Sequence, residues 1–353
     1  MNEVEAMERA VELAWTARRI SPPNPWVGCL VLGSDGEILG EGATAPPGGP
    51  HAEIAALAAA GSRSAGSTLV TTLEPCAHHG RTPPCTDAIV TAGVTRVVAG
   101  VEDPDPNVRG RGVQALQDAG LSVEVGCAAE LVTEQLRPYL HQRSTGRPFV
   151  VLKLAATLDG RIAAPDGSSR WITGPQSRTD VHLLRSRSDA IVVGAGTVRA
   201  DDPELTVRQI DGEDPVRVVL GDTPADARAE PALHLRGEPA EVLDALNERG
   251  ALQVLVEGGA DVAGRFHRAG MVDRYVLYLA PALLGGDDGI PLFRGAGAAA
   301  IGDAWRGRIV DVASLGEDLR VTLEPHSHET TGGRGASGPG RALAQEVFRA
   351  RPG

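Results

Sequence analysis

Apolar residues recur along the first half of the chain with two alternating periods. Apolar stripes at helical spacing predict helices over residues 4–19, 52–60, 86–92, 113–119 and 128–141. Short apolar runs between turn residues predict strands over residues 27–32, 37–42, 68–73, 96–101 and 121–125. The first two strands flank Gly33-Ser34-Asp35-Gly36 and form a hairpin. Because strands and helices alternate, this half predicts a three-layer α/β domain.

The second half repeats the alternation without repeating the sequence. Predicted strands cover residues 149–154, 190–193, 216–220, 254–256 and 274–279. Predicted helices cover residues 176–187, preceded by Pro175 at a favourable first position, and residues 239–249 and 262–269. This pattern indicates a second α/β domain.

A polar, turn-rich join over residues 142–148 separates the two halves. We therefore predict one domain over residues 1–146 and another over residues 147–325. Residues 326–353 are rich in Gly, Ser, Arg and His around a short helical pattern at 342–349, and are predicted to be a disordered tail.

Composition narrows the class of protein. The chain has 353 residues and a formal net charge of -12, which argues against a nucleic-acid surface because such a surface needs basic residues. Its four cysteines suggest no disulfide framework. The acidic start does not resemble a signal peptide, and no stretch approaches the roughly 18 apolar residues of a membrane helix. A cytoplasmic protein without membrane contact is expected.

One group of residues has the character of a metal site. His51 begins a predicted helix with Glu53 two residues later, Cys76 follows a predicted strand, and Cys85 precedes the next helix. One imidazole and two thiolates are the three ligands of a catalytic zinc whose fourth position is open to water. A structural zinc closed by His78 or His79, or simple burial of the cysteines, is the alternative. The order His-x-Glu, then Pro-Cys and a second Cys, favours the catalytic site of a zinc nucleobase deaminase.

Two glycine clusters follow predicted strands in the second half. Gly194-Ala195-Gly196-Thr197 and Glu257-Gly258-Gly259 could offer backbone amides to phosphates. Each cluster alone is more often a tight turn. The first also lacks the third glycine of the dinucleotide fingerprint.

The first half resembles a known enzyme family. The motifs are Asn24-Pro25-x-Val27-Gly28, His51-Ala52-Glu53 and Glu74-Pro75-Cys76-x-His78-x-Gly80-x-Thr82-Pro83-Pro84-Cys85. Together they are similar to the bifunctional deaminase–reductases of riboflavin biosynthesis, whose first half has the cytidine-deaminase-like fold. Eight residues between the two cysteines are typical of this branch.

The resemblance implies roles for these residues. His51, Cys76 and Cys85 would bind one zinc ion, and Glu53 would carry protons between the attacking oxygen and the leaving ammonia. The residues implied to hold the pyrimidine ribose phosphate are Asn24, His78, Arg81 and Asp103. Thr44 replaces a His found in many members, and Asp105 replaces an Asn.

The second half resembles the reductase half of the same family, which has the dihydrofolate-reductase-like fold. The matching stretches lie within residues 153–161, 169–173, 184–185, 196–208, 257–259 and 280–286. The residues implied to bind the nicotinamide dinucleotide are Ala155, Trp171, Thr197, Asp201, Gly258, Gly259, Ala260, Asp261, Val262, Ala263 and Gly264. Those implied to bind the pyrimidine substrate are Ser169, Arg185, Leu205, Arg208 and Glu257. Gly221-Asp222 replaces Asp-Ser or Asp-Thr near the adenosine phosphate, where a carboxylate would repel a 2′-phosphate, so NADH stays an alternative to NADPH.

The implied function is a two-step cytoplasmic enzyme, expected as a homo-oligomer. The first step deaminates 2,5-diamino-6-ribosylamino-4(3H)-pyrimidinone 5′-phosphate at zinc. The second reduces the ribosyl group of 5-amino-6-(5-phosphoribosylamino)uracil to a ribityl chain. A nucleic-acid editing deaminase and a non-enzymatic, zinc-stabilised binding module are the two rival hypotheses, and the acidic composition disfavours the first of them.

Overall fold

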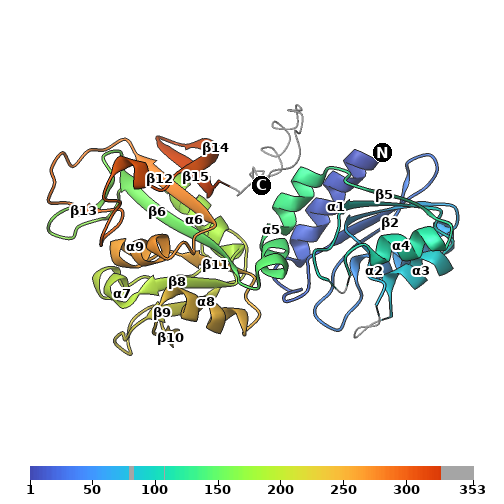
Figure 1. Cartoon of the computed structure of the whole chain (residues 1–353), viewed down its shortest axis with the longest axis horizontal. Helices are drawn as coiled ribbons and strands as arrows, with labels where there is room; N and C mark the ends of the chain where they lie inside the picture. The colour runs from blue at the N-terminus through green and yellow to red at the C-terminus, as the bar shows by residue number, and fades with distance from the viewer. Residues whose placement is uncertain (79–82, 107, 327–353) are drawn as a thin grey trace. The chain divides into compact units, whose positions relative to one another are not determined.

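The computed structural model describes residues 1–78, 83–106 and 108–326. The chain divides between Gly146 and Arg147 into two compact units, each built on its own sheet (Figure 1). None of the helices in the described part of the chain combines the length and apolarity that crossing a lipid bilayer would require.

The first unit is a three-layer α/β sandwich. Its sheet has the order β2-β1-β3-β4-β5, from β1 (Gly28–Leu32), β2 (Ile38–Ala43), β3 (Thr68–Leu73), β4 (Arg96–Val101) and β5 (Ser122–Val125). The strands β3, β4 and β5 are parallel, whereas β1 runs antiparallel to β2 and β3. One helical layer contains α1 (Glu3–Ala17) and α5 (Ala129–Thr145). The other contains α2 (Ala52–Ala60), the 3-10 helix η1 (Gly61–Ser64), α3 (Cys85–Thr91) and α4 (Arg111–Asp118).

The end of α5 corrects the prediction that residues 142–148 form a turn-rich join. The helix continues to Thr145 and ends at Gly146, which adopts the left-handed conformation with φ 78°. The helix accommodates Ser144 and Thr145, whose hydroxyls donate to the carbonyls four residues earlier at 2.8 Å and 2.9 Å. Their polarity therefore did not indicate a turn.

The second unit has an eight-stranded sheet with the order β10-β9-β8-β11-β6-β12-β15-β14. The strands from β10 to β12 in this order are parallel, β15 pairs antiparallel with β12, and β14 pairs antiparallel with β15. The strand bounds are β6 Phe149–Thr157, β8 Ala190–Gly194, β9 Val216–Leu220, β10 Leu233–Leu235, β11 Gln253–Val256, β12 Arg274–Ala280, β14 Gly307–Leu315 and β15 Asp318–Pro325. A separate two-stranded sheet pairs β7 (Arg161–Ala163) with β13 (Ile290–Pro291).

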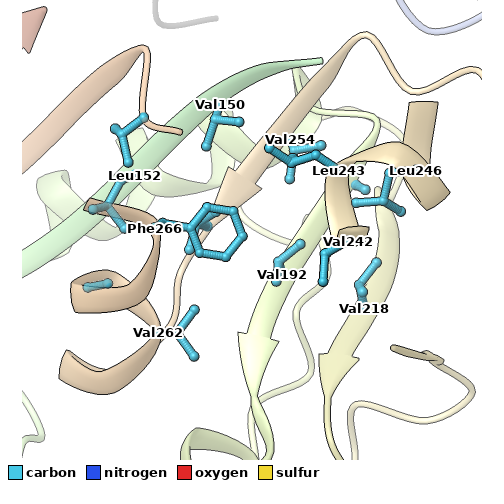
Figure 2. Close-up of a cluster of buried hydrophobic side chains, with 14 of the residues drawn as sticks. Val150, Leu152, Val192, Val218, Val242, Leu243, Leu246, Val254, Val262 and Phe266 are labelled. Atoms are coloured by element: carbon cyan, nitrogen blue, oxygen red, sulfur yellow. The ribbon is translucent and has the colours of Figure 1, made fainter. Parts of the chain in front are cut away.

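Helices bury both faces of this larger sheet. On one face α8 (Pro239–Asn247) and α9 (Ala260–Arg268) pack on the strands, and Figure 2 shows Phe266 of α9 and Val242 of α8 pointing at Val192 of β8. On the other face α6 (Pro175–Ser186) and α7 (Ala195–Asp201) cover a second apolar cluster. The short η2 (Ile301–Asp303) precedes β14.

The fold class is confirmed, with several elements that the pattern did not predict. The unpredicted elements are the 3-10 helices η1 and η2 together with β7, α7, β10, β13, β14 and β15. The carboxyl ends of the neighbouring strands β8, β11 and β6 lie side by side, because these strands are parallel. Segments that follow them are therefore brought together at one edge of the sheet.

Candidate functional site

Helix α2 begins at the residue that follows His51. Its N-cap is His51 itself, in an extended conformation, and Glu53 lies in the first turn with only 4 % of its surface exposed. Gly40 and Gly42 of β2 allow this helix to approach the sheet closely. A Cβ added at Gly42 would lie 2.3 Å from the carbonyl oxygen of Ala52, so the position accepts no side chain without moving α2.

The two cysteines reach His51 from other elements. Cys76 follows β3, and Cys85 is the first residue of α3. The His51 Nδ1 atom lies 3.2 Å from the Cys85 Sγ and 3.6 Å from the Cys76 Sγ. All three ligand atoms lie within 4.8 Å of one another, a spacing that one zinc ion can bridge.

No fourth His, Cys, Asp or Glu joins this group among the residues whose structure is described. His78 is exposed, and His79 and Arg81 lie outside the described residues. Three ligands fit the catalytic type of zinc site, which keeps one position open for water. They do not favour the closed structural site that the sequence left as an alternative.

The environment of the cluster suits proton transfer. Burial, reinforced by the charge of Cys76 and opposed by His51, raises the pKa of Glu53 to about 7. A hydrogen bond from Cys85, followed by contacts with His51, lowers the pKa of Cys76 to about 4. The hydrogen bond with Cys76 and burial raise the pKa of Cys85. A buried carboxyl group beside an open metal position can act as a general acid and base.

Glu74 organises the segment that follows β4, a role that the sequence did not reveal. Its buried carboxylate accepts backbone N–H groups from Asp103, Gly110, Gly112 and Val113, at 2.9 Å to 3.3 Å. Since Glu74 is two residues before Cys76, these bonds tie the segment to the zinc cluster. In the sequence, the sign of this role is an acidic residue directly after an apolar strand.

Two of the predicted substrate residues lie in segments that are linked to the cluster. Asp103 is 4 % exposed, and its carboxylate accepts from the Tyr139 hydroxyl and the Asp105 backbone N–H, both at 2.9 Å. Burial raises the pKa of Asp103. Asn24 is half-buried in the loop before β1. Thr44 is buried and structural here, since its hydroxyl oxygen accepts from Val27 N–H at 3.0 Å.

In the second unit, the strand ends bring two glycine turns together. The Thr197 hydroxyl accepts from the Gly259 N–H at 3.1 Å, which joins α7 to the start of α9. A Cβ added at Gly258 would lie 2.4 Å from the Cβ of Val262. The predicted cofactor residue Thr197 is therefore a neighbour of the predicted cofactor segment 258–264, and the amino ends of α7 and α9 lie close together.

A buried ion pair connects the predicted substrate residues Arg185 and Glu257. The Arg185 Nε and Nη2 atoms donate to the two carboxylate oxygens of Glu257 at 2.7 Å and 3.0 Å. Lys153 Nζ lies 3.6 Å from the same carboxylate. Burial raises the pKa of Glu257, but the charges of Arg185 and Lys153 outweigh it and hold the pKa at about 2.

Residues 204–208 lie beside this pair. Arg185 Nη1 donates to the Thr206 carbonyl at 3.1 Å, and the Arg208 backbone N–H donates to His182 Nδ1 at 3.2 Å. The Arg208 side chain pairs with Glu204. Leu205 is buried with φ 59°, so its side chain belongs to the core and only its backbone can face a ligand. The sequence carries no sign of the role of His182, because 26 residues separate it from Arg208, the residue whose backbone it contacts.

Trp171, another predicted cofactor residue, is 71 % exposed. The Arg178 guanidinium lies 4.5 Å from its ring centroid, and the two residues line a cavity of about 580 Å³. Arg170 donates to the Asp201 carbonyl, which links this segment to α7. Ala155 is half-buried on β6, and the Ser169 carbonyl accepts from Ile172 N–H. Asp222 forms an exposed ion pair with Arg236.

Both units match known protein families. Residues 1–101 match the cytidine and deoxycytidylate deaminase zinc-binding region, and residues 148–321 match the RibD C-terminal domain. The riboflavin biosynthesis protein RibD of Mycobacterium tuberculosis (strain H37Rv) is 44% identical over 331 residues, covering 90% of this chain and 96% of the relative. That of Escherichia coli K12 is 38% identical over 369 residues, covering 92% and 99%.

Solved structures give the same result. Acinetobacter baumannii RibD is 37% identical with a TM-score of 0.83, covering 92% of this chain and 98% of the other. A Thermotoga maritima structure described as a diaminohydroxyphosphoribosylaminopyrimidine deaminase/5-amino-6-(5-phosphoribosylamino)uracil reductase is 35% identical, also with a TM-score of 0.83 and the same coverage.

Proposed function

The chain belongs to the RibD family of bifunctional deaminase–reductases in riboflavin biosynthesis, and we propose which substrates it converts and which residues act on them. The first substrate is 2,5-diamino-6-ribosylamino-4(3H)-pyrimidinone 5′-phosphate, which loses its amino group as ammonia. The second is the product, 5-amino-6-(5-phosphoribosylamino)uracil, whose ribosyl group is reduced to ribityl. The observation that carries the proposal is the cluster of His51, Cys76 and Cys85 beside the buried Glu53, in one chain with a RibD C-terminal domain.

The deamination needs an activated water and a group that moves protons. His51, Cys76 and Cys85 would hold the zinc ion, which would supply the acidity that makes a bound water reactive near neutral pH. Glu53 would accept a proton from the attacking water and deliver a proton to the amino group, which leaves as ammonia while the water oxygen bonds to the same ring carbon. Glu53 is buried in the first turn of α2, two residues from the zinc ligand His51, so its carboxyl group is placed for both halves of this transfer.

Four residues are proposed to hold the pyrimidine ribose phosphate in the first unit: Asn24, His78, Arg81 and Asp103. The hydrogen bond between Asp103 and Glu74 supports this for Asp103, because Glu74 is two residues from a zinc ligand. Arg81 carries the charge and the forked donors that suit a phosphate.

The reduction needs a hydride donor placed against the sugar. A bound NADPH would supply the hydride that reduces C1′ of the ribosyl group. We propose that Ala155, Trp171, Thr197, Asp201 and residues 258–264 bind this cofactor. The pyrimidine substrate would lie against Ser169, Arg185, the Leu205 backbone, Arg208 and Glu257. The bond between Thr197 and Gly259 supports a shared cofactor site for these two turns.

NADPH is proposed over NADH, although Asp222 carries a negative charge near the expected 2′-phosphate. The ion pair with Arg236 offsets that charge, and Arg199 donates to the Asp222 carbonyl at 3.2 Å. Both guanidinium groups suit a phosphate. The cytoplasmic location, the homo-oligomer and the disordered tail stay predictions; the tail falls outside the described residues.

The test supplies the diamino-pyrimidinone phosphate with and without NADPH or NADH, and follows ammonia release and cofactor oxidation separately. Wild type should release ammonia without any nicotinamide and oxidise NADPH only after deamination. Glu53→Gln should retain zinc and lose ammonia release by at least about a hundredfold, whereas Arg208→Ala should lose only the reduction. A zinc-stabilised binding module would instead be unaffected by Glu53→Gln.

A further inference from the structure

Three side chains of α5 lie one helical turn apart along the helix. They are Gln135, Tyr139 and Arg143, whose spacing of four residues places them on one face. We call them the α5 stripe. Gln135 and Tyr139 are 1 % and 3 % exposed, so neither can contact a bound substrate over any useful area.

The two ends of the α5 stripe hold the loop that carries Asn24. Gln135 Nε2 donates to the Trp26 carbonyl at 2.9 Å, and Trp26 Nε1 donates to the Gln135 carbonyl at 3.0 Å. Arg143 Nη2 donates to the Pro23 carbonyl at 3.2 Å. Asn24 is thus fixed from both sides, by anchors one residue before it and two residues after it.

The middle of the stripe holds Asp103. The Tyr139 hydroxyl donates to Asp103 Oδ2 at 2.9 Å, and burial raises the pKa of Tyr139, so the hydroxyl keeps its proton. The Arg143 guanidinium lies 5.1 Å from the Tyr139 ring centroid, and its Nε is 4.0 Å from Asp105 Oδ2. A buried carboxylate that loses such a donor turns toward another partner or takes up a proton.

We propose that the α5 stripe positions the pyrimidine substrate by fixing the Asn24 loop and the Asp103 segment against one rigid helix. The inference rests on the proposed function, in which both residues contact that substrate. Gln135, Tyr139 and Arg143 are then positioning residues, because they act through Asn24 and Asp103. The two loops are also bonded to the zinc segments: Asp103 to Glu74, and Val27 to Thr44, whose neighbour Ala45 donates to the Pro50 carbonyl at 3.0 Å. The stripe therefore sets the distance between the substrate-binding residues and the metal.

The decisive variant is Tyr139→Phe, which removes only the hydroxyl. Because Asp103 would contact the substrate in the ground state and the transition state alike, KM for the diamino-pyrimidinone phosphate should rise about tenfold, with kcat little changed. Zinc content should stay at one per chain. NADPH oxidation with separately supplied deaminated substrate should match wild type, since that reaction uses the other unit.

A double-mutant cycle separates positioning from general loss of stability. If Tyr139 acts through Asp103, then Tyr139→Phe should add nothing to KM in an Asp103→Asn background. Ser67→Ala is the matched control. It removes a buried hydroxyl bond of 2.6 Å at the amino end of β3, opposite to Cys76, and should leave KM unchanged.

Two results would overturn the inference while the proposed function stands. One is a wild-type KM in Tyr139→Phe. The other is a rise in KM from Tyr139→Phe that is as large in the Asp103→Asn background as in wild type. If wild type itself released no ammonia from this substrate, the proposed function would fail first, and the role of the stripe with it.

Discussion

At the scale of single residues, Glu257 shows how a charge is kept where water is largely excluded. Its side chain is 7 % exposed, and it stays ionised because Arg185 donates to both oxygens while Lys153 lies nearby. A pair of this kind contributes little net stability over an apolar pair, but breaking it leaves a buried charge without compensation. The arrangement leaves part of the Arg185 guanidinium committed to the protein, so a substrate phosphate would meet only its remaining donors.

This pair predicts how the second unit responds to acid. The pKa of Glu257 is about 2 in the folded protein, against an ordinary value of 4.5. The lowered pKa of Glu257 therefore stabilises the folded state fully above about pH 4.5. This stabilisation is lost as the pH falls toward 2, because Glu257 is protonated at a higher pH in the unfolded chain than in the folded protein. Urea unfolding at a series of pH values across this window should show a steeper loss in wild type than in Glu257→Gln.

The comparison needs a control for the change from carboxylate to amide. Glu248→Gln alters an exposed carboxylate of the same unit and should keep the wild-type slope. Equal slopes in wild type and Glu257→Gln would show that Arg185 and Lys153 do not hold Glu257 ionised.

At the scale of elements, the closeness of β2 and α2 decides where His51 and Glu53 lie. Gly42→Ala would put a methyl group 2.3 Å from the Ala52 carbonyl oxygen, at the start of α2. Overpacking of this kind costs about 1–3 kcal/mol and moves the backbone. We expect weaker zinc binding and slower ammonia release, with NADPH-dependent reduction unchanged.

Competition with a colorimetric zinc chelator measures the zinc affinity of Gly42→Ala directly. Gly302→Ala is a suitable control, since a Cβ there meets nothing within 4 Å and Gly302 lies in the other unit. Unchanged zinc affinity in Gly42→Ala would mean that α2 can shift without moving His51.

The elements that the sequence predicted are those whose buried face appears as a local pattern of apolar residues. Buried parallel strands such as β4 and β8 are continuous apolar runs, and α1 has a clear apolar stripe. The strands β14 and β15 were missed because they lack a continuous apolar run: β14 has no fully buried position, and β15 mixes buried with exposed positions among charged residues. Helix α7 has only seven residues, too few for a helical period to stand out.

The candidate site likewise has residues that could be predicted from a local motif and contacts that could not. His51, Glu53, Cys76 and Cys85 form a short-range motif with fixed chemistry, so their cluster was predictable. The anchoring contacts were not, since Tyr139 meets Asp103 across 36 residues and Gln135 meets Trp26 across 109. Such pairs depend on how the layers pack, and no local pattern in one sequence encodes them.

At the scale of the whole molecule, the two reactions occur in units with separate sheets and separate hydrophobic cores. The zinc ligands all belong to the first unit, and the proposed cofactor residues all belong to the second. Metal binding to His51, Cys76 and Cys85 stabilises the unit that contains them. Removing zinc should therefore abolish ammonia release and leave the reduction of supplied 5-amino-6-(5-phosphoribosylamino)uracil within about twofold of its starting rate.

The measurement treats the full chain with a strong chelator, removes the chelator, and assays each reaction before and after zinc is returned. Restored zinc should recover deamination, which shows that the first unit did not unfold irreversibly. A parallel sample of Cys85→Ser should mimic the chelated protein in both assays without any chelator present, because serine is a poor zinc ligand. If both reactions disappeared together in each sample, the second unit would depend on the metal-bound first unit for its activity, and the two halves could not be treated as independent catalysts.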